Sequence, residues 1–355
     1  MTNLPAEPLR RWMIDVLGAE SADPSVAAHV AESLTQTSLR GVDSHGVRLF
    51  PHYVRTLRAG GVNGRPAYKF ARRAPSCGVL AADHTFGHAS GAEAMKHAIE
   101  MARECGIGAV AVQHSSHFGA AAYFGFLAAE ADMIGLAFTH SDALLQTYGG
   151  TQPYLGPNPI CFVAPCLGEA PFCLDMSCSS FSWNKIRQYR ERQEPLPAGV
   201  AADSRGCATV DPAAARSLTP IGEYKGYGLA LMVEILCSLL TGMPYGVHIK
   251  PMFDVPPETR RDLGHFFMAI NISNFQPVAV FKTRLKSLMD ELRGEPRLNG
   301  AIPVMAPGDP EKHVLQIRRA AGIPLSAADW TEFQKLGRQY NLSLPAPVEK
   351  ELVPR

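Results

Sequence analysis

The segment from Gly41 to Arg48 holds an acid, a hydroxyl, an imidazole and a guanidinium, from Asp43, Ser44, His45 and Arg48. An imidazole with its ordinary pKa near ~6.5 carries a proton close to neutral pH, and a guanidinium can grip a carboxylate with two parallel hydrogen bonds. The grouping predicts proton transfer at a carbonyl or hydroxyl carbon while a neighbouring residue holds the substrate carboxylate. The same residues are also typical of a helix that stops at Gly41 and continues into a polar turn.

Length and composition narrow the class of protein. A chain of 355 residues can form one large core or, more in keeping with its size, two packed lobes. With 34 basic and 33 acidic side chains, its charge indicates neither nucleic acid nor another polyanion as a partner. The eight cysteines form no C-x-x-C pair and are typical of reduced core residues in a cytoplasmic protein.

Two segments are candidates for targeting or membrane signals, and neither has the expected pattern. Met1 to Pro8 lacks a charged region followed by an apolar one, so we expect no export and a cytoplasmic location. The most hydrophobic long stretch, Tyr227 to Thr241, is too short for a membrane span and carries Glu234 in its middle. It is interpreted as a buried core helix.

Apolar periodicity predicts helices at both ends of the chain and alternating strands and helices between them. Helices are expected over 9–39 with a break, 50–59, 90–105, 120–131, 185–192, 222–241, 278–292 and 327–340. Strands are expected over 77–83, 107–113, 133–138, 160–164, 172–176 and 266–272. In the helix over 222–241, the expected buried face carries Leu229, Met232, Val233, Leu236 and Leu240.

Polar residues follow three of these strands. The strand over 107–113 leads into His114 to Gly119, the next into Thr139 to Asp142, and the strand over 172–176 into Ser177 to Ser180. Strand ends are where layered α/β proteins bind ligands. The three loops are therefore candidates for one binding site.

The two commonest phosphate-binding motifs of nucleotide-binding proteins are absent from the sequence. No G-x-G-x-x-G follows a strand and no Walker pattern occurs. Lys225 beside a helix start, and the hydroxyls of 177–182, could bind phosphate, or could be a solvated lysine and a serine-rich turn. The pairs His84/His88 and His114/His117 have helical metal-ligand spacing but no accompanying H-E-x-x-H, so no metal is expected.

Taken together, six ordered motifs resemble the malate/L-lactate dehydrogenase family of NAD(P)-dependent 2-hydroxyacid oxidoreductases, also called sulfolactate dehydrogenase-like. They are Arg40 to Arg48, Ser116 to Ala121, Gly156 to Pro159, Leu174 to Ser177, Lys225 to Gly228 and Pro307 to Asp309.

The resemblance implies an α/β, non-Rossmann fold with a mixed-sheet nucleotide-binding lobe and a helical lobe built from both termini. The expected segments are 1–74 (helical), 75–255 (NAD(P)-binding) and 256–355 (returning to the first lobe). The resemblance also implies NAD or NADP as cofactor and a homodimer.

Residue roles follow from the same resemblance. His45 resembles the general acid with Ser44 in its relay, Arg48 the clamp on the substrate carboxylate, and His117 the residue beside the nicotinamide that serves as a base in some members. Positions matching cofactor contacts are His117, Phe118, Gly119, Ser141, Asp175, Met176, Ser177, Lys225 and the turn of Gly308, Asp309 and Pro310.

Three departures leave the substrate open. His140 replaces the usual Asn or Lys, Cys178 the common Thr, and Asn184 the usual Gly. The expected reaction moves a hydride between NAD(P)H and C2 of a small 2-oxo or 2-hydroxy acid. The alternatives are reduction of cyclic or N-alkyl 2-imino acids, of the piperideine-2-carboxylate type, and a non-catalytic homologue that binds a nucleotide or carboxylate.

Overall fold

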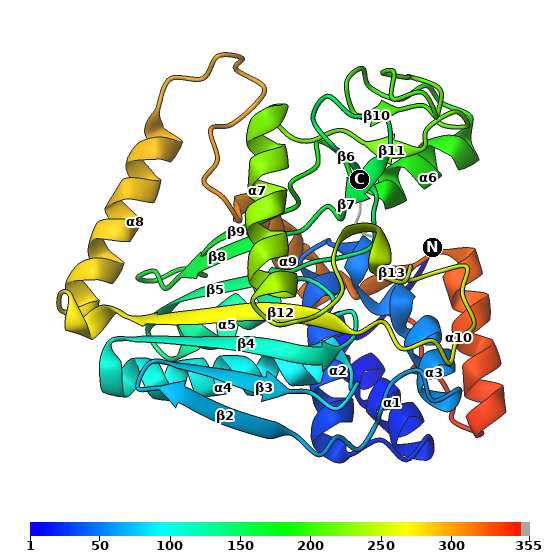
Figure 1. Ribbon diagram of the computed structural model, residues 1–355, viewed down its shortest axis with the longest axis horizontal. Coiled ribbons are helices and arrows are strands. Elements are labelled where there is room, and N and C mark those ends of the chain that lie inside the picture. Colours follow the sequence, from blue (N-terminus) through cyan, green and yellow to red (C-terminus); the bar gives the residue numbers. More distant parts are fainter. Residues whose placement is uncertain (349–355) are drawn as a thin grey trace.

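The computed structural model describes residues 1–348, and its largest element is a seven-stranded sheet (Figure 1). The strand order is β2-β3-β4-β12-β5-β8-β9. The bounds are β2 Lys69–Ala74, β3 Cys77–Ala81, β4 Ile107–Ser115, β5 Met133–Thr139, β8 Ile160–Ala164, β9 Phe172–Met176 and β12 Leu263–Asn271.

The sheet is mixed, as expected. Strands β3 and β4 are parallel, whereas every other neighbouring pair in this sheet is antiparallel. The late strand β12 lies between β4 and β5 and pairs with both, so it joins strands from the first half of the chain. This arrangement differs from the parallel, doubly wound sheet of a Rossmann domain, which agrees with the missing glycine fingerprint.

One face of the sheet is covered by α4 (Gly87–Cys105) and α5 (Ala122–Glu130). Helix α4 turns alanines such as Ala94, Ala98 and Ala102 inward. Small side chains allow the helix backbone to approach closely: a Cβ on Gly108 of β4 would collide with the carbonyl oxygen of Ala98. The loops that follow β4 and β5, which carry candidate site residues, therefore extend from closely packed strands.

Helices from both ends of the chain pack into a second core. Its elements are α1 Ala6–Ala19, α2 Pro24–Leu39, α3 Phe50–Arg58 and α10 Ala327–Tyr340. Trp12, Phe50 and Phe333 form its aromatic centre, and strand β1 (Thr2–Leu4) pairs with β13 (Ile323–Leu325). Figure 1 shows the N-terminus beside α10 and β13.

Residues after 256 contribute to both bodies, because β12 lies in the sheet while α10 lies with α1. The division of the chain into three segments stays a prediction.

A third, small body surrounds a sheet of order β10-β11-β6-β7. Its elements are β6 Leu145–Gln146, β7 Pro153–Leu155, β10 Ala201–Ala202, β11 Ser217–Leu218 and helix α6 Trp183–Arg192. Ser182 caps α6 by accepting a hydrogen bond from the backbone N–H of Lys185.

Helix α7 (Tyr224–Glu234), which continues as a wider turn over Ile235–Leu239, corrects two predictions. Leu229, Met232 and Leu240 are 38%, 39% and 58% exposed, so the interpretation as a buried core helix is wrong, and of the predicted face only Val233 is fully buried. The helix instead buries a face of smaller and polar residues: Gly226, Ala230, Val233, Glu234 and Cys237. A narrow side-chain layer suits close packing on the sheet, and the larger side chains point outward.

Two further predictions change. The predicted turn at Gly308 to Pro310 is the start of α9 (Asp309–Ala321), with Pro310 in the first turn, where its missing N–H costs nothing. All eight cysteines are free, but Cys105 and Cys207 are exposed rather than in the core. Helix α8 (Val278–Gly294) is confirmed. Within residues 1–348, none of the helices is both long and apolar enough to cross a bilayer.

Candidate active site

A cavity of about 1780 Å³ lies where the helical body, the sheet and the small third body meet. Typical small-molecule pockets are ~300–1,000 Å³, so this one can hold a dinucleotide together with a small acid. Ten of the predicted site residues line it: Ser44, His45, Arg48, His117, Gly119, Ser141, Asp175, Ser177, Gly308 and Pro310.

The loop carrying His45 is shaped by two glycines. Gly41 has a φ of +85°, a left-handed conformation that ends α2 and is strained for other residues. Gly46 lies against Ser38 so closely that any Cβ would collide with the Ser38 Oγ, which accepts a hydrogen bond from the backbone N–H of Val47 at 2.9 Å. The chain between them forms two short 3₁₀ turns, Asp43–His45 and Val47–Leu49.

Asp43 holds this loop rather than facing the cavity. Its carboxylate accepts hydrogen bonds from Arg318 of α9 at 2.5 and 2.8 Å, and the same guanidinium donates to the carbonyl of Ser38. Helix α9, from the C-terminal part of the chain, thus fixes the loop that carries His45.

His45 and His117 lie together in the cavity. Their rings are stacked, with centroids 5.7 Å apart. The Ser44 Oγ is 2.9 Å from the Nδ1 of His45, and the Tyr53 hydroxyl is 2.7 Å from the Nδ1 of His117. With Nδ1 engaged on each ring, the Nε2 atoms are left for a substrate or cofactor.

Tyr53 was missed by the sequence reasoning. Only its position in the sequence could have suggested a role in the site, because it lies eight residues beyond His45, on the helix that directly follows the His45 loop.

Burial changes the protonation of both histidines. It lowers the pKa of His45 to about 4, with the positive charge of Arg48 as a second cause. The pKa of His117 is also well below its ordinary value, chiefly through burial and then through His45. The expectation of an ordinary histidine near pH 6.5 is therefore wrong for both residues, whose lowered pKa values leave the imidazoles neutral at pH 7.

Arg48 is an uncompensated cation. It is exposed to the cavity, and among residues 1–348 it has no ion-pair or hydrogen-bond partner. Among the other arginines that line the cavity, Arg261 is 8% exposed and donates to Asp142 at 2.5 Å, whereas Arg40 and Arg187 have no ion pair within residues 1–348. Sequence reasoning did not find the ion pair between Arg261 and Asp142. Because Arg261 is paired with a carboxylate, and Arg48 is the unpaired cavity arginine nearest to His45 along the chain, an anionic substrate group fits best at Arg48.

Several observations test whether the cavity fits a dinucleotide. The Ser141 Oγ is buried without a hydrogen-bond partner, as expected of a group that serves a ligand. Asp175 is open to the cavity and accepts from the backbone N–H of Ala122 at 2.8 Å, and surrounding protein raises its pKa to about 6. Gly119 and Gly308 have φ values of +77° and +94°, which bring bare backbone to the cavity wall. These residues fit a sugar-phosphate ligand.

Four predicted cofactor contacts do not line the cavity of this chain. Phe118 packs on Phe124 in the core beneath it. Asp309 forms an ion pair with Arg293 at 2.7 Å. Met176 ends β9 without reaching the cavity wall, and Lys225 is exposed at the start of α7.

The three departures from the family pattern are all at or near the site. His140 is buried at the cavity wall, and its Nε2 accepts from the backbone N–H of Gly264 at 2.8 Å. Asn184 of α6 lines the cavity and approaches the carbonyl of Ser44 at 3.5 Å, while Cys178 is buried beneath. One helical turn after Asn184, Arg187 also lines the cavity.

Known proteins are similar to this chain over nearly its whole length. A family model described as malate/L-lactate dehydrogenase matches residues 4–334. The malate dehydrogenase of Pyrococcus abyssi is 36% identical over 346 residues, which cover 95% of this chain and 94% of that protein. The solved sulfolactate dehydrogenase of Methanocaldococcus jannaschii is 31% identical with a TM-score of 0.90, covering 96% of this chain and 98% of the other.

A further solved structure, the delta1-piperideine-2-carboxylate reductase of Pseudomonas syringae pv. tomato, is 26% identical with a TM-score of 0.84 and covers 95% of this chain and all of that chain. The fold is thus the sulfolactate dehydrogenase-like fold that the motifs predicted. The chain belongs to the malate/L-lactate dehydrogenase family and is an NAD(P)-linked hydroxyacid dehydrogenase.

Proposed function

We propose that this enzyme interconverts a small 2-oxo acid and the corresponding 2-hydroxy acid, with His45 exchanging the proton and Arg48 holding the C1 carboxylate. The observation that carries the proposal is the unpaired Arg48 guanidinium three residues from a histidine stacked on a second one. NAD or NADP, when bound, supplies or accepts the hydride at the substrate C2.

Each site residue has one task. Arg48 binds both oxygens of the carboxylate and so fixes which face of C2 is presented. His45 carries the proton of the reacting oxygen, oriented by its contact with Ser44. His117, held by Tyr53, stands beside His45, where it can position the substrate and the nicotinamide ring.

The lowered pKa of His45 favours its neutral form. Neutral His45 is ready to accept the hydroxyl proton in the oxidation of a 2-hydroxy acid. In reduction it must first gain a proton. A carboxylate on Arg48 offsets the charge that repels that proton, so substrate binding raises the pKa of His45.

For the cofactor, we propose that the backbone around Gly119 and Gly308, the hydroxyls of Ser141 and Ser177, and the carboxylate of Asp175 hold it along the cavity. The contacts proposed for Phe118, Met176, Lys225, Asp309 and Pro310 rest on the family resemblance. The choice between NAD and NADP is left to direct binding measurements.

The first test follows nicotinamide absorbance with a panel of 2-oxo and 2-hydroxy acids. Turnover is expected for the wild type, and His45→Gln is expected to lower it about 10²–10⁴-fold, the usual share of general acid–base catalysis, with cofactor binding retained. Near-normal turnover of this variant would remove His45 from its role. No turnover of any acid or imine by the wild type, with nucleotide still bound, would favour a non-catalytic binder.

A second substrate class is supported by the likeness to a piperideine-2-carboxylate reductase. A 2-imino acid presents the same carboxylate to Arg48 and differs only in the reacting heteroatom. Adding methylamine to assays with pyruvate distinguishes the two classes, because only an imine reductase gains activity from it.

We also propose a homodimer formed through α7. Leu231, Ile235, Leu239 and Leu240 on α7 and its extension are 40%, 48%, 58% and 58% exposed, an apolar row that single chains rarely leave in water. Sedimentation is expected to show a dimer for the wild type and a monomer for Leu239→Glu. A dimer unaffected by this change would place the interface elsewhere. The cytoplasmic location and the absence of a nucleic-acid partner stay predictions.

A further inference from the structure

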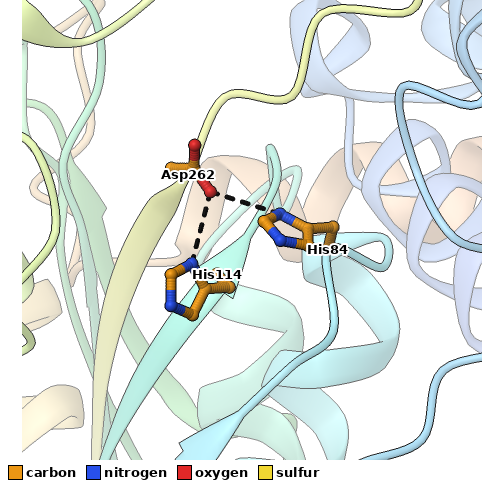
Figure 2. Close-up of side chains that lie close together, drawn as sticks. All are labelled: His84, His114 and Asp262. Carbon is orange, nitrogen blue, oxygen red and sulfur yellow. Dashed lines mark hydrogen bonds and ion pairs between the residues drawn. The ribbon is translucent and has the colours of Figure 1, made fainter.

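Two histidines and an aspartate meet at the ends of three interior strands of the sheet (Figure 2). His84 follows β3, His114 lies near the end of β4, and Asp262 comes directly before β12. The Asp262 Oδ1 is 3.2 Å from the Nδ1 of His84 and 3.3 Å from the Nδ1 of His114. One ligand-type atom from each residue lies within 4.8 Å of the other two.

The backbone, not side-chain packing alone, brings these residues together. The N–H of His84 donates to the carbonyl of His114 at 2.7 Å, which extends the parallel β3–β4 pairing by one step. His84, His114 and Asp262 all have left-handed φ values, of +58°, +52° and +53°. This conformation is uncommon for histidine, so the fold holds all three side chains in directions they would not adopt freely.

Hydrogen bonding within the cluster leaves one atom unexplained. The Nδ1 of His84 is buried and has no hydrogen-bond partner among residues 1–348, because its approach to Asp262 lacks hydrogen-bond geometry. Buried polar atoms almost always have a partner. A positive ion between the three side chains would supply it.

The separations suit a transition metal. Zinc binds imidazole nitrogen and carboxylate oxygen at about 2.0–2.2 Å, so two ligands of one tetrahedral ion are roughly 3.3–3.6 Å apart. The two separations from Asp262 are 3.2 and 3.3 Å. We propose that His84, His114 and Asp262 form a site for a divalent transition metal of the zinc type, with water as the fourth ligand.

The charges around the cluster are compatible with this ligand. The negative charges of Asp83 and Asp262 act on His84, opposed by the positive charge of Arg260. The pairs that sequence spacing had suggested, His84 with His88 and His114 with His117, are not the ones that meet.

The site is structural rather than chemical. None of its three residues lines the large cavity. Asp262 directly follows Arg261, which reaches into that cavity and pairs with Asp142. A bound ion therefore cross-links the start of β12 to the ends of β3 and β4, and this stabilises the position of Arg261 in the cavity wall.

The test uses the full, tag-free chain after treatment with a chelator. Titration with Co²⁺, followed by its visible absorption, is expected to show one tetrahedral ion per chain that Zn²⁺ displaces. Zn²⁺ is also expected to raise the melting temperature, because an ion that binds only the folded chain stabilises it. Absence of a saturable one-to-one site would overturn the proposal.

Matched variants locate the ion. His84→Asn, His114→Asn and Asp262→Asn suit the left-handed backbone, which asparagine tolerates, while removing a ligand. Each is expected to weaken binding by more than about tenfold, since losing even an outer partner of a metal ligand costs ~10–100-fold. His313→Asn, at an exposed histidine of α9, is the control and should bind as the wild type does. Unchanged affinity in the three cluster variants would place the ion elsewhere and refute the assignment.

Discussion

At the scale of single residues, substrate binding and proton transfer are coupled through Arg48. The guanidinium that we propose holds the carboxylate is also one of the two causes that lower the pKa of His45. Filling the site with an anion and moving the proton are therefore not independent events. A substrate without a carboxylate would lose both its anchor and the charge that lets His45 take up a proton.

Replacing Arg48 separates the two effects. Arg48→Gln is expected to raise the pKa of His45 above about 4 in the free enzyme, because only the desolvation effect remains. It is also expected to weaken binding of 2-oxo acids. Histidine NMR titration and inhibition by a non-reacting acid measure the two changes. Arg187→Gln, at another arginine of the cavity wall, is the control for general loss of positive charge. An unaltered His45 titration in Arg48→Gln would contradict the coupling.

Sequence reasoning could name His45, Arg48 and His117 because their chemistry is intrinsic to the side-chain type. It could place Asp142 only as one residue of a polar loop, and it could not find Tyr53 or Arg261, since a tyrosine on an apolar helix and an arginine before a strand carry no local signal. Their positions depend on contacts between distant segments, such as Tyr53 with His117 and Arg261 with Asp142. The neutral state of His45 was likewise invisible, because it arises from burial.

At the scale of elements, helix α9 holds the loop that carries His45 in place through Arg318. The Arg318–Asp43 pair joins residues 275 positions apart and holds the loop from the side away from the cavity. The pair was outside the reach of sequence analysis, which predicted a turn rather than a helix at Asp309. Periodicity did predict α3, α4 and α8, because each has a run of apolar residues long enough to show a period.

Breaking this tie should affect turnover more than stability. Asp43→Asn removes a partly exposed ion pair, worth about 0–1 kcal/mol, so the melting temperature should change little. Turnover is expected to fall by up to about 10²-fold, because small misplacements of a reacting group are costly. Steady-state kinetics and thermal melts measure both, with Arg319→Ala on the exposed side of α9 as control. A variant with normal turnover would show that the loop does not need α9.

Helix α7 shows why pattern reading fails for some elements. Its apolar residues do follow a helical period, but period alone does not say which face meets the protein. Here the face with Gly226 and Ala230 packs inward, and the leucines are exposed. An apolar helix face at an interface between two chains has the same pattern as one in a core, so only the packing of neighbouring elements distinguishes them.

At the scale of the whole molecule, the buried histidines make the fold sensitive to acid. His88 and His265 are fully buried in the body of the sheet and helices, and burial lowers the pKa of each to about 3. His45 and His52 are shifted in the same direction, to about 4. In the unfolded chain, all four would take up protons near pH 6.5. Below that pH the unfolded state therefore binds more protons than the folded one.

The free energy of unfolding is consequently expected to be highest above pH 6.5 and to fall as the pH drops toward 3. His88 and His265 together contribute a slope of up to about 3 kcal/mol per pH unit in that window, as each bound proton contributes ~1.4. Urea unfolding at pH 7.5, 6.5, 5.5 and 5.0 measures the slope, and the values at pH 7.5 and 6.5 should differ little. A flat profile down to pH 5 would mean that these imidazoles gain protons inside the folded protein. The interior around β12 and α4 would then be wetter than their burial implies.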